Sequence, residues 1–487
     1  MTSQSQSPHD VIILMTDQQR ADLCGREGFP VDCTPAVDAL AAQGRWFDRA
    51  YTSAPVCVPA RISLLTGRFP SAHRARENAA LEHPDYSADL MDVARAAGLR
   101  TAVIGKNHSH LTADRVDTFI EYGHFGRKGP DESGFPAWLR DLGSATATEA
   151  TPFPVPAQSP ARIVDDAIGW LDQGESDRSL LWLSIPEPHV PYQVPEPYFS
   201  TYTFETVPPP ATGAESLDHR TTPWRWLAAH GAEVERQRET LLRARANYVG
   251  MIRLIDDQIA RLVGHLECRG RLARTLIVFL SDHGDFAGEY GLMRKGPELP
   301  EVLTRIPLVF SGAGVDPGPG PSPAHVSIVD VFPTLCELLG QPVPEGVQGR
   351  SLVPILRGRP FPEREFDSVY AEQGVGELPY TDQDAAGLER TSLDTLNEVT
   401  QSGSLRMIRS GRWKLQVGVT GPTTLYDLQD DPYELIDRSR EPGHEPIIRD
   451  LLERLVRWQM RAADPLPIVP RGYTRKRHPR NYYWDES

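Results

Sequence analysis

One segment of the sequence combines a potential nucleophile with residues that start and end a helix. It reads Cys57-Val-Pro59-Ala-Arg61 and continues to Gly67. Proline suits the first turn of a helix and glycine suits its end, so the pattern predicts a helix that begins near Cys57. Helix N-termini favour anions, and Arg61 comes one turn later, on the same side as Cys57. These residue types favour an activated thiolate or another anionic nucleophile at Cys57.

Four apolar runs each end in reactive side chains. The runs do not alternate with polar residues, which is typical of strands buried on both faces of a mostly parallel sheet. In such sheets, ligands bind beyond the carboxyl ends of the strands. The runs and the residues that follow them are 11–15 with Asp17 and Gln18, 101–104 with Lys106 and His108, 180–185 with His189, and 276–280 with Asp282 and His283. Four strands that deliver polar groups to one edge jointly predict an active site there.

Two acids, an amide and an imidazole in this set could hold a metal ion. They are Asp17, Gln18, Asp282 and His283. Carboxylate and amide oxygens suit a hard cation such as Ca²⁺ or Mg²⁺. The alternative is that the two aspartates only cap helices or form turns. The run Asp-His-Gly-Asp directly after a buried strand favours the metal site.

The elements that must position these residues alternate along the chain. Helical spacing of apolar residues occurs at 35–43, 86–98, 232–266 and 328–339, between the expected strands. Alternating strands and helices indicate an α/β fold, with a large, mostly parallel sheet sandwiched by helices. Residues 126–160 and 203–222 are rich in Pro, Gly, Ser and Thr, and we expect them to form surface insertions.

The character of the sequence changes after Pro360. Residues 405–409, 413–417 and 424–426 resemble short strands of an antiparallel sheet, and 447–463 resembles a helix. We therefore predict two domains. Residues 1–365 form the catalytic domain, and residues 366–487 form a smaller α+β domain that carries an antiparallel sheet and a basic, aromatic tail.

Composition limits the classes of partner. The 487 residues carry a net charge of −15, which disfavours nucleic acid and anionic membranes. An anionic substrate would then need a local basic pocket. The five cysteines fit neither a zinc site nor a disulfide framework. No run approaches the roughly 18 apolar residues that span a bilayer, and the first ten residues lack a secretory pattern. We expect a soluble, cytoplasmic protein.

Read together, these motifs resemble the signature of the type I sulfatases, in the alkaline phosphatase superfamily. The segment Cys57-Val-Pro59-Ala-Arg61 with Leu65-Thr-Gly-Arg68 carries the likeness. It extends from about residue 11 to about residue 441. The other matching motifs, in chain order, are Asp17-Gln18, Gly105-Lys-Asn-His108, Pro188-His-Val-Pro-Tyr192, Asp282-His-Gly-Asp285, and Leu425-Tyr-Asp-Leu428 with Asp431-Pro-Tyr-Glu434.

The resemblance implies a mechanism. In this family a separate maturation enzyme oxidises the motif cysteine to formylglycine, whose hydrate attacks the sulfur of a small-molecule sulfate ester. If the family mechanism applies to this chain, Cys57 is the precursor of that nucleophile. The metal ligands would be Asp17, Gln18, Asp282 and His283, with Ca²⁺ expected and Mg²⁺ or Mn²⁺ as alternatives. Arg61, Lys106 and His108 would hold the hydrate and the sulfuryl oxygens, and His189 and Lys295 would bind sulfate and protonate the leaving oxygen.

Departures from the family pattern indicate a branch. Gln18 replaces a common second acid, and His283 replaces a common asparagine. Both variants resemble choline sulfatases and phosphonate monoester hydrolases, as does Asn78, a candidate substrate-binding residue whose alternative role is to form a turn. A phosphonate monoester or phosphodiester hydrolase is therefore the competing reading. The phosphonate branch replaces the Lys and His of Gly-Lys-x-His, which this chain keeps as Lys106 and His108.

Two further alternatives concern binding. A catalytically silent anion-binding protein would leave Cys57 as a thiol, but the complete motif set argues against it. The tail contains Tyr482, Tyr483 and Trp484, large apolar groups that rarely extend into water. We expect them to dock on the body of the same chain or on a neighbouring subunit of a homo-oligomer.

Overall fold

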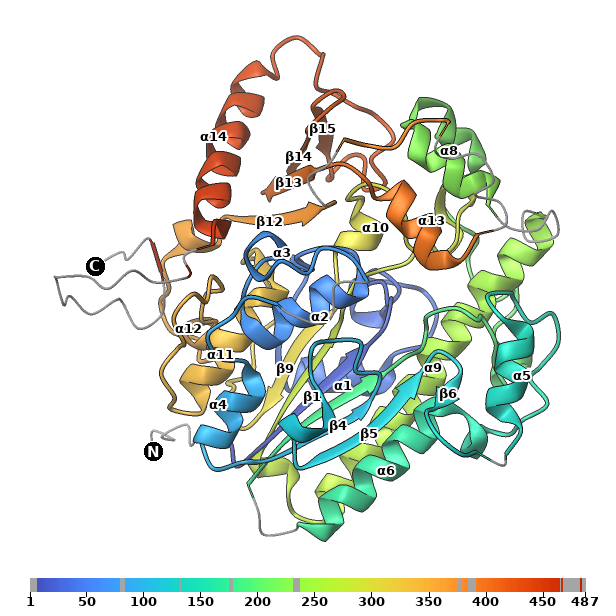
Figure 1. Ribbon diagram of the computed structural model, residues 1–487, viewed down its shortest axis with the longest axis vertical. Coiled ribbons are helices and arrows are strands. Elements are labelled where there is room, and N and C mark those ends of the chain that lie inside the picture. The colour runs from blue at the N-terminus through green and yellow to red at the C-terminus, as the bar shows by residue number, and fades with distance from the viewer. Residues whose placement is uncertain are drawn as a thin grey trace, which may run out of the picture.

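A computed structural model describes residues 7–78, 84–131, 133–174, 178–230, 237–374, 378–383, 391–464, 466 and 482–483 (Figure 1). A nine-stranded sheet forms its centre. In spatial order the strands are β10 (Pro321–Ser322), β2 (Gly44–Phe47), β9 (Leu308–Gly312), β8 (Thr275–Ser281), β1 (Asp10–Thr16), β7 (Ser179–Ile185), β4 (Arg100–Gly105), β5 (Thr118–Gly123) and β6 (Gly126–Arg127).

The middle of this sheet is parallel, as the apolar runs predicted. β1 pairs in parallel with both β7 and β8, and β4 pairs in parallel with β7 and β5. Every residue of β1, β7 and β8 is buried. Strands covered on both faces cannot expose a polar row, so their sequences read as continuous apolar runs. The antiparallel pairs lie toward the edges, at β8–β9, β2–β9 and β5–β6.

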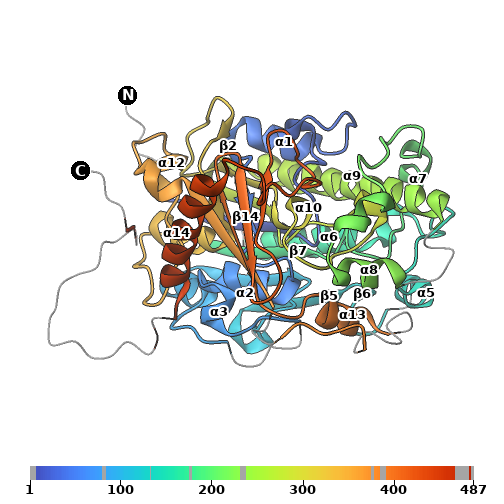
Figure 2. The same cartoon turned by 90° about the horizontal axis from the view of Figure 1, so that it is seen from above.

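Helices cover both faces of the sheet, which confirms the α/β sandwich. One face packs against α1 (Pro35–Ala42), α6 (Ser159–Gln173) and α9 (Arg238–Cys268). The other packs against α2 (Cys57–Thr66), α4 (Leu90–Ala96) and α11 (Val331–Leu338). Viewed from above, α1 and α9 lie on one side of the molecule and α2 and α3 (Pro70–His73) on the other (Figure 2).

The predicted helices differ from the observed ones mainly at their starts. The helix expected at 86–98 begins at Leu90, because Asp89 caps it and forms a capping box with Asp92. α9 begins at Arg238, and part of the preceding stretch lies outside the described residues. The expected surface insertions contain short elements: α5 (Phe135–Leu142), the beginning of α6, and α8 (Thr222–Ala229) at the boundary. Phe135 and Leu139 of α5 are buried, so this segment packs rather than only extending outward.

An antiparallel sheet lies at one end of the molecule, at the top of Figure 1, as expected for the C-terminal part. Its strands are β12 (Ser368–Gln373), β13 (Leu405–Ser410), β14 (Trp413–Gly418) and β15 (Thr424–Asp427). α14 (Glu445–Ala462) buries Leu451, Leu455 and Trp458. These three side chains belong to the same core cluster as α2 and α11, so the C-terminal elements pack directly on the catalytic part.

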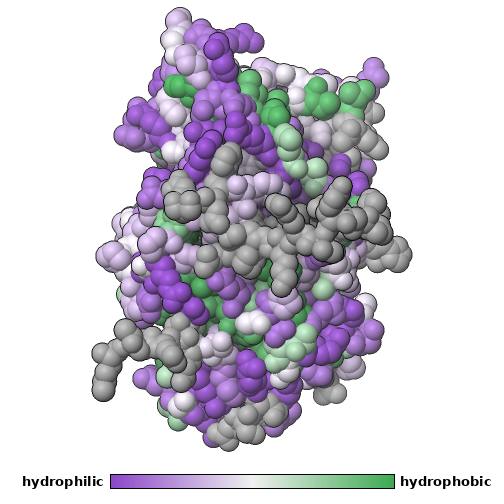
Figure 3. Space-filling view, turned by 90° about the vertical axis from the view of Figure 1, so that its left-hand side faces the viewer, coloured by the Kyte–Doolittle hydropathy of each residue, from purple (hydrophilic) through white to green (hydrophobic). Residues whose placement is uncertain are grey.

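The surface carries mostly polar side chains. The face shown in Figure 3 is mainly hydrophilic, with small hydrophobic patches. Within the described residues, no helix has the length and apolar character needed to cross a membrane. The remaining short elements are β3 (Ala50–Tyr51), β11 (Val326–Ser327), α7 (Tyr198–Thr201), α10 (Glu301–Thr304), α12 (Val353–Leu356) and α13 (Leu393–Thr400).

Candidate active site

The sheet order brings the reactive residues to one edge. At its carboxyl end, Thr16 of β1 lies opposite Ile185 of β7 and Ser281 of β8. Gly105 of β4 lies opposite Ser184 of β7. The residues that follow these strands therefore meet above the centre of the sheet, as the rule for open α/β sheets requires.

Cys57 is the first residue of α2, and Gly67 ends that helix in the left-handed conformation. The sequence predicted both ends. The backbone N–H of Val58 donates to Oδ1 of Asn78 at 3.3 Å, so Asn78 satisfies one of the free amides of the first turn. Cys57 is fully buried at the base of the site. The helix start thus presents the sulfur to the groups that converge from the sheet.

Four side chains offer ligand atoms that all lie within 4.8 Å of one another: Asp17, Cys57, Asp282 and His283. His283 donates from Nδ1 to the carbonyl of Gly284 at 2.8 Å, which leaves Nε2 facing the sulfur of Cys57 at 3.3 Å. A histidine with one nitrogen held by a carbonyl and the other directed into a cluster has the arrangement of a metal ligand.

Gln18 contacts this cluster through its backbone. Its backbone has φ of 71°, a conformation that a non-glycine residue adopts at a cost. Its N–H donates to Oδ1 of Asp282 at 2.9 Å, and the hydroxyl of Tyr248 donates to its carbonyl at 2.6 Å. Its side-chain nitrogen donates to Asp285, whereas its buried Oε1 has no hydrogen-bond partner among the described residues. An unpartnered amide oxygen beside two carboxylates fits a hard cation such as Ca²⁺ or Mg²⁺.

Arg61 holds the two carboxylates in place. Its guanidinium donates to Asp282 at 2.9 Å and to Asp17 at 3.0 Å, and all three side chains are fully buried. It also donates to the carbonyl of Lys106 and the hydroxyl of Ser184, each at 2.8 Å. A planar guanidinium with several fixed donors joins the ends of β1, β8, β4 and β7 through one side chain.

Cationic and imidazole side chains surround the sulfur. The Nζ atom of Lys295 lies 3.1 Å from Sγ of Cys57, and Lys106 forms an ion pair with Asp17. His189 donates from Nδ1 to the carbonyl of Val190 at 2.7 Å. His108 has φ of 41°, and its buried Nδ1 has no partner among the described residues. Such a set can bind the oxygens of a transferring anion.

The electric field of the site favours anions. Burial alone would raise the pKa of Asp17, but Lys106 and Arg61 hold it well below its usual range. Burial and Asp17 would also raise the pKa of the Cys57 thiol, yet Lys106, Lys295 and His283 lower it well below its usual value. Burial lowers the pKa of His189 to about 3. An anionic nucleophile is therefore stabilised at position 57.

A cavity of about 550 Å³ opens above the sulfur. Seven of the residues singled out from the sequence line it: Gln18, Cys57, Asn78, Lys106, His108, His189 and Lys295. Asp17, Arg61, Asp282 and His283 lie beneath it, fully buried. The structure thus brings together all eleven residues singled out from the sequence.

Several lining residues were not among those singled out from the sequence. His124 and Phe125 follow β5, Arg294 precedes Lys295, and Asn397 comes from α13. His124 could have been found, because it follows a strand of the same sheet. That strand does not form a continuous apolar run, because Glu121 interrupts it and four of its first five residues remain partly exposed.

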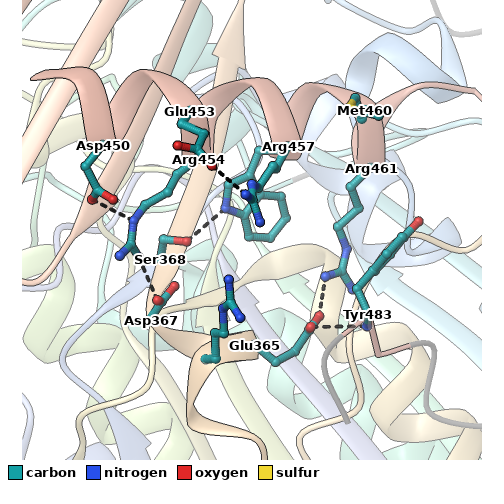
Figure 4. A pocket seen from close by; sticks show the side chains of 12 residues that line it. Glu365, Asp367, Ser368, Asp450, Glu453, Arg454, Arg457, Met460, Arg461 and Tyr483 are labelled. Atoms are coloured by element: carbon teal, nitrogen blue, oxygen red, sulfur yellow. Dashed lines mark hydrogen bonds and ion pairs between the residues drawn. The ribbon is translucent and has the colours of Figure 1, made fainter.

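A second cavity, of about 490 Å³, lies between α14 and β12 (Figure 4). Its arginines are paired: Arg454 with Asp367 and Asp450, and Arg461 with Glu365. Tyr483 of the tail lies with its ring 4.6 Å from the guanidinium of Arg461. Its described lining residues include neither a cysteine nor a member of the ligand cluster, so we assign the chemistry to the first cavity.

Comparison with known proteins places the chain in a family. The family model described as Sulfatase matches residues 9–341. The chain is 27% identical to a multifunctional alkaline phosphatase superfamily protein of Trinickia caryophylli, over 96% of this chain and 99% of that one. It is 29% identical to a choline-sulfatase of Rhizobium meliloti, over 93% and 88%. The crystal structure of a phosphonate monoester hydrolase of Agrobacterium radiobacter superposes with a TM-score of 0.78 at 25% identity, over 94% and 97%.

These matches agree with the motifs at residues 57–68 and 282–285 and with the architecture of both sheets. The protein belongs to the sulfatase family, in the alkaline phosphatase superfamily.

Proposed function

We propose that this protein is a hydrolase of sulfate monoesters, that Cys57 is converted to a formylglycine nucleophile, and that one divalent metal ion is held beside it. The observation that carries the proposal is the convergence on Cys57. Asp17, Asp282 and His283 offer ligand atoms within 4.8 Å of one another and of its sulfur, and Lys295 lies 3.1 Å away. The family resemblance supports the aldehyde, which a separate maturation enzyme would form.

The metal ligands in this proposal are Asp17, Gln18, Asp282 and His283. Ca²⁺ is the proposed ion because the set is rich in oxygen, with Mg²⁺ or Mn²⁺ as alternatives. When bound, the ion supplies positive charge that makes a neighbouring hydroxyl more acidic. Arg61, which donates to both carboxylates, would hold them in place to receive the ion.

The other residues act on the transferring group. The reaction adds water across the ester bond and releases the alcohol, sulfate and a proton. Lys106, His108 and Lys295 would donate hydrogen bonds to the sulfuryl oxygens, where negative charge shifts during transfer. Lys295 would deliver a proton to the leaving oxygen, and His189 would do so once the negative charge of the bound ester raises its lowered pKa. Asn78, already bonded to the start of α2, would contact the substrate from the cavity wall.

The competing function is hydrolysis of phosphonate monoesters or phosphodiesters. Similarity to the solved phosphonate monoester hydrolase favours it. Sulfate monoesters and phosphonate monoesters both carry one negative charge, so net charge does not separate them. The donors around the group can do so, and this chain has Lys106 and His108 at the positions that are Tyr and Thr in the phosphonate branch.

A release assay with matched 4-nitrophenyl esters tests the proposal. We expect kcat/KM for the sulfate monoester to exceed that for the phosphonate monoester and the phosphodiester. Lys106→Ala should lower kcat more than it raises KM, because a donor directed at the transition state acts on the chemical step. A clear preference for the phosphorus esters would assign the protein to the competing class.

The charges of the residues that line the cavity also indicate which kind of alcohol the substrate ester could carry. Arg294 adds positive charge to that of Lys106 and Lys295, whereas the charge of Lys128 is offset by Glu121, the one carboxylate among the described lining residues. Glu121 is already paired with Lys128 at 2.6 Å. We therefore expect choline sulfate, whose alcohol is a cation, to react more slowly than a sulfate ester of a neutral or anionic alcohol of similar reactivity. A faster reaction with choline sulfate would reject this substrate class.

A further inference from the structure

His124 contacts three of the proposed active-site residues. It follows β5 and precedes β6, at the wall of the active-site cavity. Its Nε2 atom lies 2.9 Å from Nζ of Lys106. Its ring stacks on that of His189, with centroids 3.8 Å apart and planes at 24°, and meets His108 edge to face at 6.4 Å.

These contacts define the protonation of the ring. A lysine ammonium has three donors and no acceptor, so Nε2 of His124 must accept from Lys106. The proton of the neutral ring is then on Nδ1. A second proton would place positive charge against Lys106 and against the stacked His189. Burial, His189 and Lys106 together hold the pKa of His124 well below its usual value, in agreement with a neutral ring.

A small cavity lies beside the ring. Its volume is about 10 Å³, and its lining includes His124, Glu187, His189 and Gln193. Three buried atoms at this place have no hydrogen-bond partner among the described residues: Nδ1 of His124, Oε2 of Glu187 and Oε1 of Gln193. A space of this size holds one water molecule when two to four polar groups surround it. With Glu187 ionised, one donor and two acceptors suit a water that accepts a hydrogen bond from Nδ1–H of His124 and donates to both oxygens.

We infer that His124 is a positioning residue that, through one internal water shared with Glu187 and Gln193, fixes the direction of the Lys106 ammonium and the plane of the His189 ring. The catalytic effect of His124 rests on the proposed function, whereas the contacts of its ring do not depend on that function. Of the three N–H groups of Lys106, one points to Asp17 and one to His124. The third is left for an oxygen of the transferring group. The stack holds His189 while its Nδ1 is held by Val190, which leaves Nε2 to exchange a proton with the substrate.

Two substitutions separate the two contacts. His124→Phe keeps an aromatic face on His189 and removes the acceptor of Lys106. His124→Gln keeps an acceptor and removes the face. Misplacing a catalytic donor by about 1 Å can cost on the order of 100-fold. We expect His124→Phe to lower kcat about 10- to 100-fold with KM changed less than about threefold, and His124→Gln to lose less. The matched control is His219→Phe at an exposed position, which should leave both constants unchanged.

The comparison uses whichever 4-nitrophenyl ester the wild type hydrolyses, so a preference for phosphonate would refute the proposed function without affecting this test. A second readout does not depend on turnover. In ¹⁵N spectra of histidine-labelled protein, the His124 signal, identified by its loss in His124→Phe, should show the Nδ1–H form at neutral pH. Glu187→Gln should shift that signal. An Nε2–H form, or a folded His124→Phe with unchanged kcat, would overturn the inference. If His124→Phe fails to fold, two other results together would overturn the inference. They are an unchanged kcat in His124→Gln and an Nε2–H signal for His124 in the wild-type protein.

Discussion

The ammonium nitrogen of Lys295 lies 3.1 Å from the sulfur of Cys57, although the two residues are 238 positions apart in the chain. Both are buried at the base of the active-site cavity. The contact means that a cation is in place beside the proposed nucleophile before any substrate arrives. It also means that removing the lysine changes the reacting centre itself and not only the path into it.

Lys295→Ala should therefore reduce the chemical step. Loss of one preorganised donor typically costs about 100- to 1,000-fold in kcat, and we expect a loss of that order with a smaller change in KM. Intact-mass analysis of the same preparation should still show the aldehyde at position 57, because the maturation enzyme acts on the cysteine. Cys57→Ala should have no turnover, and full activity of that variant would contradict the mechanism.

The unpartnered Oε1 of Gln18 predicts a role in metal binding. Gln18→Leu keeps most of the side-chain volume and removes the oxygen, so the apparent affinity for Ca²⁺ should fall at least about tenfold. The rise in melting temperature with added Ca²⁺ measures this affinity, because a ligand that binds the folded state stabilises it.

The neighbouring Gln19 is the matched control for this experiment. It is equally buried, but its side-chain nitrogen contacts the sulfur of Cys24, and Gln19 does not line the active-site cavity. Gln19→Leu should leave the affinity for Ca²⁺ unchanged. Chelation should abolish turnover in the wild type, and a metal-free preparation with normal turnover would reject the ligand set.

His73 predicts a pH dependence of stability. Burial lowers its pKa to about 3, from 6.5 in a model compound, and its Nδ1 accepts from the N–H of Ala75 at 3.2 Å. The unfolded chain therefore binds a proton below pH 6.5 that the folded chain excludes. This contribution to stability is complete above pH 6.5 and is lost as the pH falls toward 3, at about 1.4 kcal/mol per pH unit.

His73→Gln should remove that loss, so the difference in melting temperature between wild type and variant should shrink on acidification. The exposed His219, changed in the same way, provides the control. Parallel curves for wild type and His73→Gln between pH 6.5 and 4.5 would show that the pKa of His73 is not lowered.

The docking of Tyr482 predicts a stabilising role for the tail. Its hydroxyl donates to the carbonyl of Ser351, and its ring meets Phe366 edge to face at 5.7 Å. The expectation that the tail docks on its own chain is thereby confirmed for Tyr482, whereas Trp484 lies outside the described residues. Tyr482→Ala should lower the free energy of unfolding by about 3 kcal/mol, and Tyr482→Phe by about 1 kcal/mol.

Tyr483 provides the matched control, because 61% of its surface is exposed. Tyr483→Ala removes only an exposed contact with Arg461 and should change the free energy of unfolding by less than about 1 kcal/mol. Sedimentation of the same variants tests the expected homo-oligomer. If Tyr482→Ala has the same melting temperature and the same sedimentation coefficient as the wild type, the tail has no role in stability or assembly.

The sequence determined the strands that carry the chemistry. A strand buried on both faces must be apolar throughout, so β1, β7 and β8 were visible as continuous runs, and the polar residues after each run were the candidate ligands. The two ends of α2 could also be predicted from the local sequence, because Pro59 and the left-handed Gly67 each affect only the few residues beside them. The family motif then linked residues far apart in the chain.

Only the tertiary structure decided which side chains touch. His124 reaches Lys106 because β5 is the neighbour of β4 in the sheet, and Asn397 of α13 reaches the same cavity from the C-terminal part. Such contacts depend on strand order and on packing between elements, which no local spacing encodes. The same holds for the distance between Lys295 and Cys57, since the loop after β8 must return over the start of α2. The sequence thus determined what each residue can do, and the packing determined where each one acts.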